Sequence, residues 1–173
     1  KCRENGKRNV PGDLEAEVGN IEWVRSLVDE TVAAIMLEPI QSMAGVRTAG
    51  PSFFRDLRTL CDEHGIVLIY DEVQTGVGRT GEWFFAGSAA SDGVVPDIVT
   101  LAKALGSGVP VGACLVTSEV ASKIKENDLG TTFGGGMLIT YGLASSPATS
   151  GLNQPFSSHH CYKRVSVHLK SYV

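Results

Sequence analysis

The stretch Ile66-Val67-Leu68-Ile69-Tyr70-Asp71-Glu72 decides the fold class that this sequence predicts. It begins with a continuous apolar run, which is typical of a strand buried on both faces of a parallel sheet, and it ends at two carboxylates. Residues 51–64, just before it, have apolar side chains at helical spacing, with Pro51 in the first turn and Gly65 after the last. A helix that leads into a buried strand is one unit of an α/β fold.

The same pattern recurs on both sides of this stretch. Apolar runs at 32–37 and 98–102 end at Glu38 and Lys103, and a further run covers 113–116. We therefore expect an α/β fold, a mostly parallel sheet with flanking helices. Ligands of such sheets bind at the carboxyl ends of the strands, which is where the ionisable residues stand. The expected helices lie at 20–30, 51–64 and 118–125.

Composition and charge argue against nucleic acid and membranes as binding partners of this chain. The net charge of −4 offers no electrostatic reason for binding nucleic acid. No apolar run is long enough for a transmembrane helix, so no membrane partner is expected. The four cysteines are too widely spaced for a paired metal site or a dense disulfide framework, which favours reduced thiols in the cytoplasm. The chain starts at Lys1 rather than Met, so we expect a start inside a longer sequence, and organellar targeting stays open.

Lys103 and Asp71 are the residues with the most chemical promise. A lysine amine attacks a carbonyl only when neutral, and the apolar residues around Lys103 favour that form through desolvation. On this segment alone, however, a surface lysine at a strand end is the commoner arrangement. The carboxylate of Asp71 can pair with a protonated ring nitrogen, although Asp more often caps a turn. In an extended stretch Val73 would share a face with Asp71 and pack on a planar ring, while Gln74 donates to a ring oxygen.

A glycine-rich segment and a histidine-containing tail give weaker signals. In Gly130-Thr131-Thr132-Phe133-Gly134-Gly135-Gly136, a hydroxyl and backbone amides can bind phosphate, and the chain has no P-loop or dinucleotide-binding glycine motif. The segment His159-His160-Cys161, together with His168, offers zinc-binding side chains. Adjacent histidines splay apart and lack helical spacing, so no metal site is expected.

Four segments of the chain match a known family in order and spacing. They are Glu38-Pro39-Ile40-Gln41, Asp71-Glu72-Val73-Gln74-Thr75-Gly76-Val77-Gly78-Arg79-Thr80-Gly81, Pro96-Asp97-Ile98-Val99-Thr100-Leu101-Ala102-Lys103 and Gly130-Thr131-Thr132-Phe133-Gly134-Gly135. Together these segments resemble the class III aminotransferases, which are pyridoxal-phosphate (PLP) enzymes of fold type I, and the resemblance covers roughly residues 13–136. It implies that residues 1–136 are part of a PLP-binding large domain, whereas residues 137–173 are an atypical tail that we expect to be poorly ordered.

The resemblance assigns a role to each candidate residue. Lys103 is implied to hold PLP as a Schiff base and to shuttle the proton between substrate and cofactor. Asp71 is implied to pair with the pyridine nitrogen, Val73 to pack on the ring, and Gln74 to bond the ring hydroxyl oxygen. Thr132 is implied to bind the phosphate in the neighbouring subunit, so a homodimer is expected. The implied reaction is ping-pong transfer of an amino group from an amine or amino acid to a keto acid or aldehyde.

Three departures from the family pattern limit this reading. The branches that act on ornithine, acetylornithine and 4-aminobutyrate usually have Gln-Gly-Glu where this chain has Gln41-Ser42-Met43, so the claim to those substrates is weakened. The upstream phosphate loop and the small C-terminal domain of the family have no counterpart here. After Gly136 the long alanine-rich helix of the family is replaced by a segment without Asp or Glu.

Two alternatives to a transaminase remain. One is an aminomutase or racemase on the same fold, which amino-group transfer from an omega-amino substrate to a keto acid would discriminate. The other is a catalytically inactive truncated relative, which the missing phosphate loop favours. We expect the isolated chain to self-associate or to be marginally folded, because a piece of a large α/β domain leaves apolar strand edges uncovered.

Overall fold

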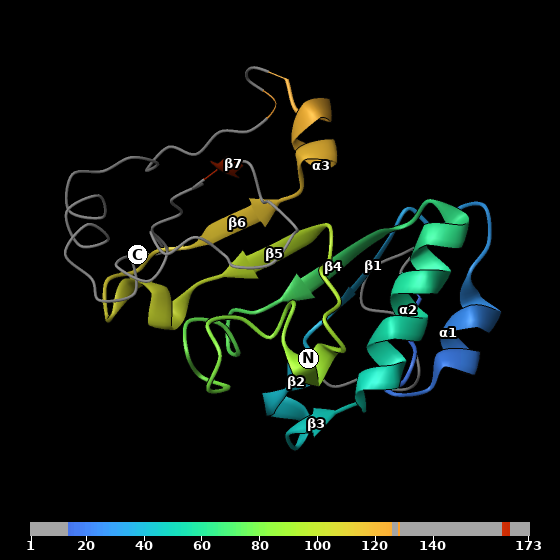
Figure 1. The fold of residues 1–173 in the computed structure, drawn as a ribbon, viewed down its shortest axis with the longest axis horizontal. Coiled ribbons are helices and arrows are strands. Elements are labelled where there is room, and N and C mark those ends of the chain that lie inside the picture. Colours follow the sequence, from blue (N-terminus) through green and yellow to red (C-terminus); the bar gives the residue numbers. More distant parts are fainter. Residues whose placement is uncertain (1–13, 126–127, 129–163, 167–173) are drawn as a thin grey trace.

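A central five-stranded sheet organises the described part of the chain, which comprises residues 14–125, 128 and 164–166 of the computed structural model. A second, two-stranded sheet pairs β2 (Ile40–Gln41) with β3 (Arg47–Thr48) and lies near one end of the central strands (Figure 1). In spatial order, the strands of the central sheet are β1 (Ala34–Leu37), β4 (Val67–Asp71), β5 (Ile98–Leu101), β6 (Ala113–Val116) and β7 (Arg164–Ser166).

Helices and short 3-10 turns connect these strands. Helices α1 and α2 lie side by side near β1 and β4, and α3 follows β6 at the top of the view, apart from these two helices (Figure 1). The α-helices are α1 (Ile21–Leu27), α2 (Pro51–His64) and α3 (Ser118–Lys123), and the 3-10 helices are η1 (Ser42–Ala44), η2 (Ala89–Ser91) and η3 (Lys103–Gly106). The predicted α/β fold class is confirmed.

The directions of the strands make the sheet mixed rather than mostly parallel. Strands β1, β4 and β5 run parallel to one another, whereas β6 is antiparallel to β5 and β7 is antiparallel to β6. A parallel crossover needs a long connection, usually an α-helix. Residues 102–112, between β5 and β6, contain only η3, so the chain returns antiparallel beside β5.

Helix α2 has the expected bounds because both of its ends are fixed locally. Pro51 occupies the first turn after the extended residue Gly50. At the other end Gly65 adopts a left-handed conformation, with φ of 66°, and its N–H donates to Cys61 O. A residue with a side chain would be strained at that φ, so glycine ends the helix where the next strand must begin.

The two faces of the central sheet are covered unequally. Strand alternation and register give one face to Leu37, Leu68, Tyr70, Val99, Leu101 and Leu115, all of them buried; we call this the covered face. The other is named the open face and includes Met36, Ile69, Asp71, Ile98, Thr100 and Cys114, which are half-buried or exposed. Val116, also on that side at the end of β6, is buried. The prediction that 32–37 is buried on both faces is wrong for the described residues: β1 is an edge strand, and Met36 is 59% exposed.

Aromatic side chains fill the space between α2 and the covered face. The ring centroid of Phe54 lies 5.9 Å from that of Tyr70 and 5.0 Å from that of Phe85, both in edge-to-face geometry. A second core cluster lies beneath the loops that follow β4 and β5. Its buried members are Phe84, Val99, Leu101, Leu105, Val111 and Leu115.

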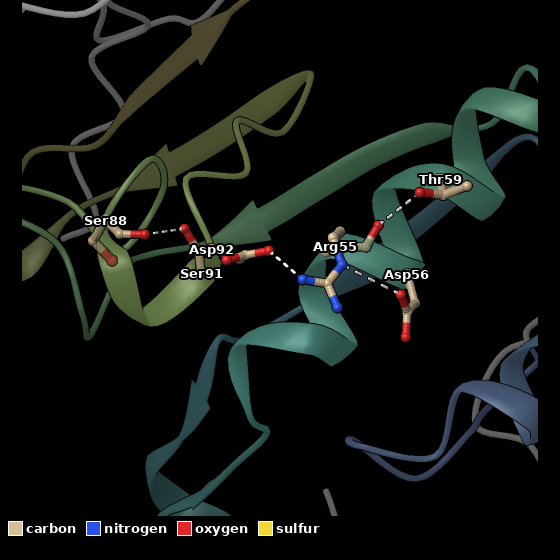
Figure 2. Close-up of polar contacts among 6 residues, drawn as sticks. All are labelled: Arg55, Asp56, Thr59, Ser88, Ser91 and Asp92. Atoms are coloured by element: carbon tan, nitrogen blue, oxygen red, sulfur yellow. Dashed lines mark hydrogen bonds and ion pairs between the residues drawn. The ribbon is translucent and has the colours of Figure 1, made fainter.

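Two charged contacts tie α2 to the connection between β4 and β5. Arg55 Nη1 lies 2.8 Å from Asp92 Oδ2, at the end of η2, as Figure 2 shows. Arg58 Nη1 donates to Asp97 Oδ2 at 2.8 Å, and the same oxygen accepts from the amide of Leu68 at 2.8 Å. Asp97 therefore joins helix α2 to the amino-terminal part of β4 just before β5 begins, at the ends of these strands opposite to Asp71 and Leu101.

Candidate functional site

Asp71, the last residue of β4, lies on the open face opposite Thr100 of β5. Its Oδ1 accepts from the hydroxyl of Thr100 at 3.1 Å and from the amide of Val73 at 3.0 Å. Both bonds end at the same oxygen, so among the described residues Oδ2 keeps its lone pairs for another donor. The carboxylate is thus oriented by its own sheet while one oxygen stays available.

Lys103 begins η3, with only Ala102 between it and the end of β5, and lies three residues beyond Thr100. Its φ of 44° lies in the left-handed region, which costs an L-residue about 1–2 kcal/mol. The side chain is exposed, so the apolar, desolvated setting expected from the sequence is not provided by the described residues. The cause is the sharp turn at Lys103, after which Leu105, not the lysine, enters the second core cluster.

Val73 and Gln74 lie in a turn rather than in an extended stretch. The amide of Val73 folds back onto the carboxylate of Asp71, which is the geometry of an Asx-turn. The extended backbone assumed for Val73 in the sequence analysis is therefore not present, because the carboxylate of Asp71 accepts from the Val73 amide and a turn follows β4. Both Val73 and Gln74 are half-buried beside Asp71. Thr132 and the glycine-rich segment around it lie outside the described residues.

Two glycines let the chain pass close to itself at this end of the sheet. A Cβ on Gly76 would come within 2.7 Å of Leu101 Cδ2 and 2.9 Å of Glu72 O, so the turn after β4 packs directly on β5. A Cβ on Gly106 would lie 2.6 Å from Val111 Cγ1. Val111 of the same chain therefore approaches the Gly106 backbone too closely for a side chain to fit there.

Glu72 is the residue of this region that sequence reasoning missed. It is only 1% exposed, and its carboxylate accepts from the amides of Phe85 at 2.7 Å and Ala86 at 2.8 Å and from the Thr75 hydroxyl at 3.2 Å. Burial raises the pKa of this carboxyl, and the bonds from Ala86, Phe85 and Thr75 oppose that rise. Its two strongest partners are backbone amides more than a dozen residues away, which leave no side-chain signal in a sequence.

Neither a cluster of metal-ligating side chains nor a membrane-spanning helix is present within the described ranges. Over 14–125, 128 and 164–166, no three His, Cys, Asp or Glu side chains are grouped so that they could hold a metal ion. In that same part of the chain, no helix is both long and apolar enough to cross a bilayer. Cys61 and Cys114 are free thiols. The segment His159-His160-Cys161 and His168 lie outside the described residues.

Comparison with known proteins places this geometry in a family. The model of the family Aminotransferase class-III matches residues 5–144, which is most of the chain. The chain belongs to this family. Its similarity to the class-III aminotransferases extends over all the described elements except β7.

Relatives of this class-III aminotransferase chain are known by sequence and by structure. It is 44% identical over 147 residues to an acetylornithine aminotransferase of Methanopyrus kandleri, covering 85% of this chain and 37% of that protein. It is 48% identical over 125 residues to an acetylornithine aminotransferase of Archaeoglobus fulgidus, covering 71% and 32%. An ornithine aminotransferase structure from Toxoplasma gondii, with partial occupancy of PLP at its active site, matches with a TM-score of 0.70 at 34% identity, covering 81% of this chain and 33% of that one. The chain thus spans about a third of the length of these relatives.

Proposed function

We propose that the protein takes part in PLP-dependent amino-group transfer, with Lys103 as the residue that holds the cofactor. The observation that carries this proposal is the oriented carboxylate of Asp71 at the end of β4, paired with Thr100 just before Lys103, in a chain of the class-III aminotransferase family. PLP supplies an electron sink for the substrate carbon when it is bound. In this proposal, side chains at the strand ends hold and orient the cofactor and move the proton.

Asp71 fits the cofactor's ring nitrogen. A protonated ring nitrogen needs a carboxylate acceptor that does not rotate away, and Asp71 Oδ1 is fixed by Thr100 and the Val73 amide. Its Oδ2 would then accept a hydrogen bond from the ring N–H, and the carboxylate would favour the protonated form of the ring nitrogen. The fixed orientation of the Asp71 carboxylate supports this assignment.

Lys103, Val73 and Gln74 complete the proposed cofactor contacts. In this proposal the Nζ of Lys103 would hold the cofactor at its carbonyl carbon and, once the substrate's amine has displaced it there, would move a proton to and from the substrate carbon that carries the amino group. Exposure of the side chain leaves Nζ free to swing between those two positions. Val73 packs against the ring, and Gln74 donates a hydrogen bond to the ring oxygen from the turn held by Asp71.

The proposed substrates are an amine or amino acid as donor and a keto acid or aldehyde as acceptor. Acetylornithine and ornithine aminotransferases among the relatives support a donor with an amino group far from its carboxylate. Met43, 91% exposed in η1, stands where those branches usually have glutamate, which argues for a different contact at that end of the donor.

We further propose a cytoplasmic homodimer, in which residues 1–136 belong to the cofactor-binding domain and Thr132 binds phosphate in the partner's site. The free thiols of Cys61 and Cys114 support a reducing compartment. Sedimentation of the chain with and without PLP tests the assembly: a dimer that forms only with cofactor agrees with a phosphate site shared between subunits, and a monomer throughout contradicts it.

An absorbance titration with PLP tests the central proposal. The chain and its Lys103→Ala variant are mixed with PLP, dialysed, treated with borohydride and analysed by mass spectrometry. We expect the unsubstituted chain to keep a long-wavelength band through dialysis and to gain the reduced cofactor's mass on the peptide containing Lys103. Identical spectra for the two proteins, or a mass gain on other lysines, would contradict a cofactor role for this residue.

Turnover assays separate the alternatives on the same fold. Transfer of an amino group from an omega-amino donor to a keto acid supports a transaminase. Rearrangement or racemisation of a single substrate, without an acceptor, supports an aminomutase or racemase. Cofactor uptake without any turnover supports an inactive relative.

A further inference from the structure

We propose that Glu72 is a positioning residue that fixes the cofactor-contacting turn of residues 73–76 by clamping the two ends of the loop 72–86 together. The inference rests on the proposed function, because it assigns a role toward the cofactor contacts of Asp71, Val73 and Gln74. Glu72 itself faces away from that site into the protein, where it is 1% exposed. It therefore acts through the loop and not on the reacting atoms.

The backbone of Glu72 fixes the start of the loop. Its N–H donates to Thr100 O at 2.9 Å, which continues the pairing of β4 with β5 one residue beyond Asp71. Its carbonyl accepts from the amide of Gly76 at 2.9 Å, which closes the turn that contains Val73 and Gln74. Gly76 in turn packs on Leu101, so the closed turn rests on β5.

The side chain of Glu72 fixes the far end of the same loop. Its Oε2 accepts from the amide of Phe85 and its Oε1 from the amide of Ala86. Phe85 is itself anchored, since its carbonyl accepts from the Ser88 hydroxyl at 2.7 Å and its ring packs on Phe54. One buried residue thus joins the cofactor-contacting turn to a rigid part of the aromatic core.

The chemistry of this clamp requires a carboxylate. Three donors converge on two oxygens, the amides of Phe85 and Ala86 and the hydroxyl of Thr75. A glutamine in the same place would present an NH₂ group to one of the two backbone amides, so a donor would face a donor. Leaving one buried amide without an acceptor is costly, so the isosteric change breaks one end of the clamp.

The effect of losing the Glu72 contacts can be distinguished from a general loss of folding stability. Glu72→Gln changes the loop contacts, whereas Leu57→Ala removes core packing from α2, where Leu57 is 1% exposed. Thr75→Val removes only the third and longest of the three bonds, so it is the graded control. Glu72→Gln is therefore expected to displace the turn of residues 73–76, whereas Leu57→Ala is expected to lower only the stability of the fold.

The experiment measures PLP affinity and amide exchange on the full chain with these three substitutions. We expect Glu72→Gln to raise the Kd for PLP by about tenfold or more, because the turn beside Asp71 loses its fixed position. Leu57→Ala should leave that Kd within about twofold while lowering Tm at least as much, and Thr75→Val should fall between the two. In Glu72→Gln the amides of Phe85 and Ala86 should exchange about tenfold faster relative to the Leu68 amide. Global destabilisation does not raise this ratio, because it speeds exchange of the core Leu68 amide at least as much.

Each result decides between the two proposals. An unchanged Kd in Glu72→Gln, or an unchanged exchange ratio, overturns the clamp while cofactor binding by the unsubstituted chain still supports the proposed function. Failure of the unsubstituted chain to bind PLP overturns the proposed function and the cofactor half of this inference. The exchange ratio still decides whether Glu72 holds the loop.

Discussion

The covered and open faces of the central sheet are formed by the same strands, yet one face packs in the core and the other carries the candidate site. On the covered face, Leu68 and Tyr70 of β4 are fully buried against α2 and the aromatic cluster. On the open face, Ile69 and Asp71 of the same strand are half-buried. Because successive side chains of a strand point to opposite faces, one face packs into the core and the other carries the residues of the candidate site.

The contrast explains how a strand end can hold a reactive group precisely. Asp71 is positioned by a strand whose opposite side chains are locked in a packed core, so its backbone does not depend on the contacts it makes at the site. Four predictions test this division, taken from the largest expected effect to the smallest.

The largest effect is expected from the covered face. Phe54→Ala removes a fully buried ring that contacts Phe53, Tyr70 and Phe85. We expect a loss of about 3–5 kcal/mol in the free energy of unfolding, from lost apolar burial and the cavity left behind. Urea denaturation measures it, and a loss under about 1 kcal/mol would show that the cluster collapses around the gap.

The reactivities of two thiols, Cys61 and Cys114, allow the two sides of the sheet to be compared within one chain. Burial raises the pKa of Cys61, on the buried face of α2, to about 11, and it also raises the pKa of Cys114 on the open face of the sheet. Because Cys61 is fully buried and Cys114 only partly, we expect iodoacetamide at pH 8.5 to modify Cys114 about tenfold faster or more. Peptide mass spectrometry follows both sites, and the rates should converge in urea. Equal rates in the native chain would mean that α2 opens freely.

Backbone strain at Lys103 is expected to have a smaller effect. Glycine accepts a φ of 44° without the clash that a Cβ causes, so Lys103→Gly should be more stable than Lys103→Ala by about 1 kcal/mol. Both variants lack the amine, so the difference isolates the backbone. Thermal unfolding of the pair measures it, and a higher Tm for the alanine variant would rule out a strained turn.

The smallest effect is expected at the open edge. Met36→Thr replaces a side chain that is 59% exposed on β1, and threonine keeps the strand preference. We expect a change under about 0.5 kcal/mol, as at most surface positions. A loss above about 2 kcal/mol in denaturation of the 173-residue chain would indicate that another copy or segment covers this side in solution.

Local signals made part of the fold predictable. Pro51 and Gly65 set the bounds of α2, and the apolar run at 113–116 matches β6 residue for residue. The run at 98–102 gave β5 to within one residue. These elements depend on neighbours in sequence, so a single chain reveals them.

Features that depend on distant partners were not predictable in the same way. The direction of β6 depends on the short connection after Lys103, and the exposure of Met36 depends on what lies beside β1. At the candidate site, Asp71 and Lys103 stand out because of their positions after apolar runs. Glu72 does not stand out, because the backbone amides that donate to its carboxylate could belong to residues of almost any type.

The antiparallel return of β6 has a consequence for the order of assembly. The turn that begins with Lys103 lies in the connection 102–112, whereas β1 and β4 are joined through the longer connection 38–66. Closing the shorter loop costs less chain entropy, by about 0.9 kcal/mol for these two lengths. Residues 98–116 thus form the most local pairing of the central sheet, and the lysine turn closes at a lower entropic cost than the neighbouring parallel pair.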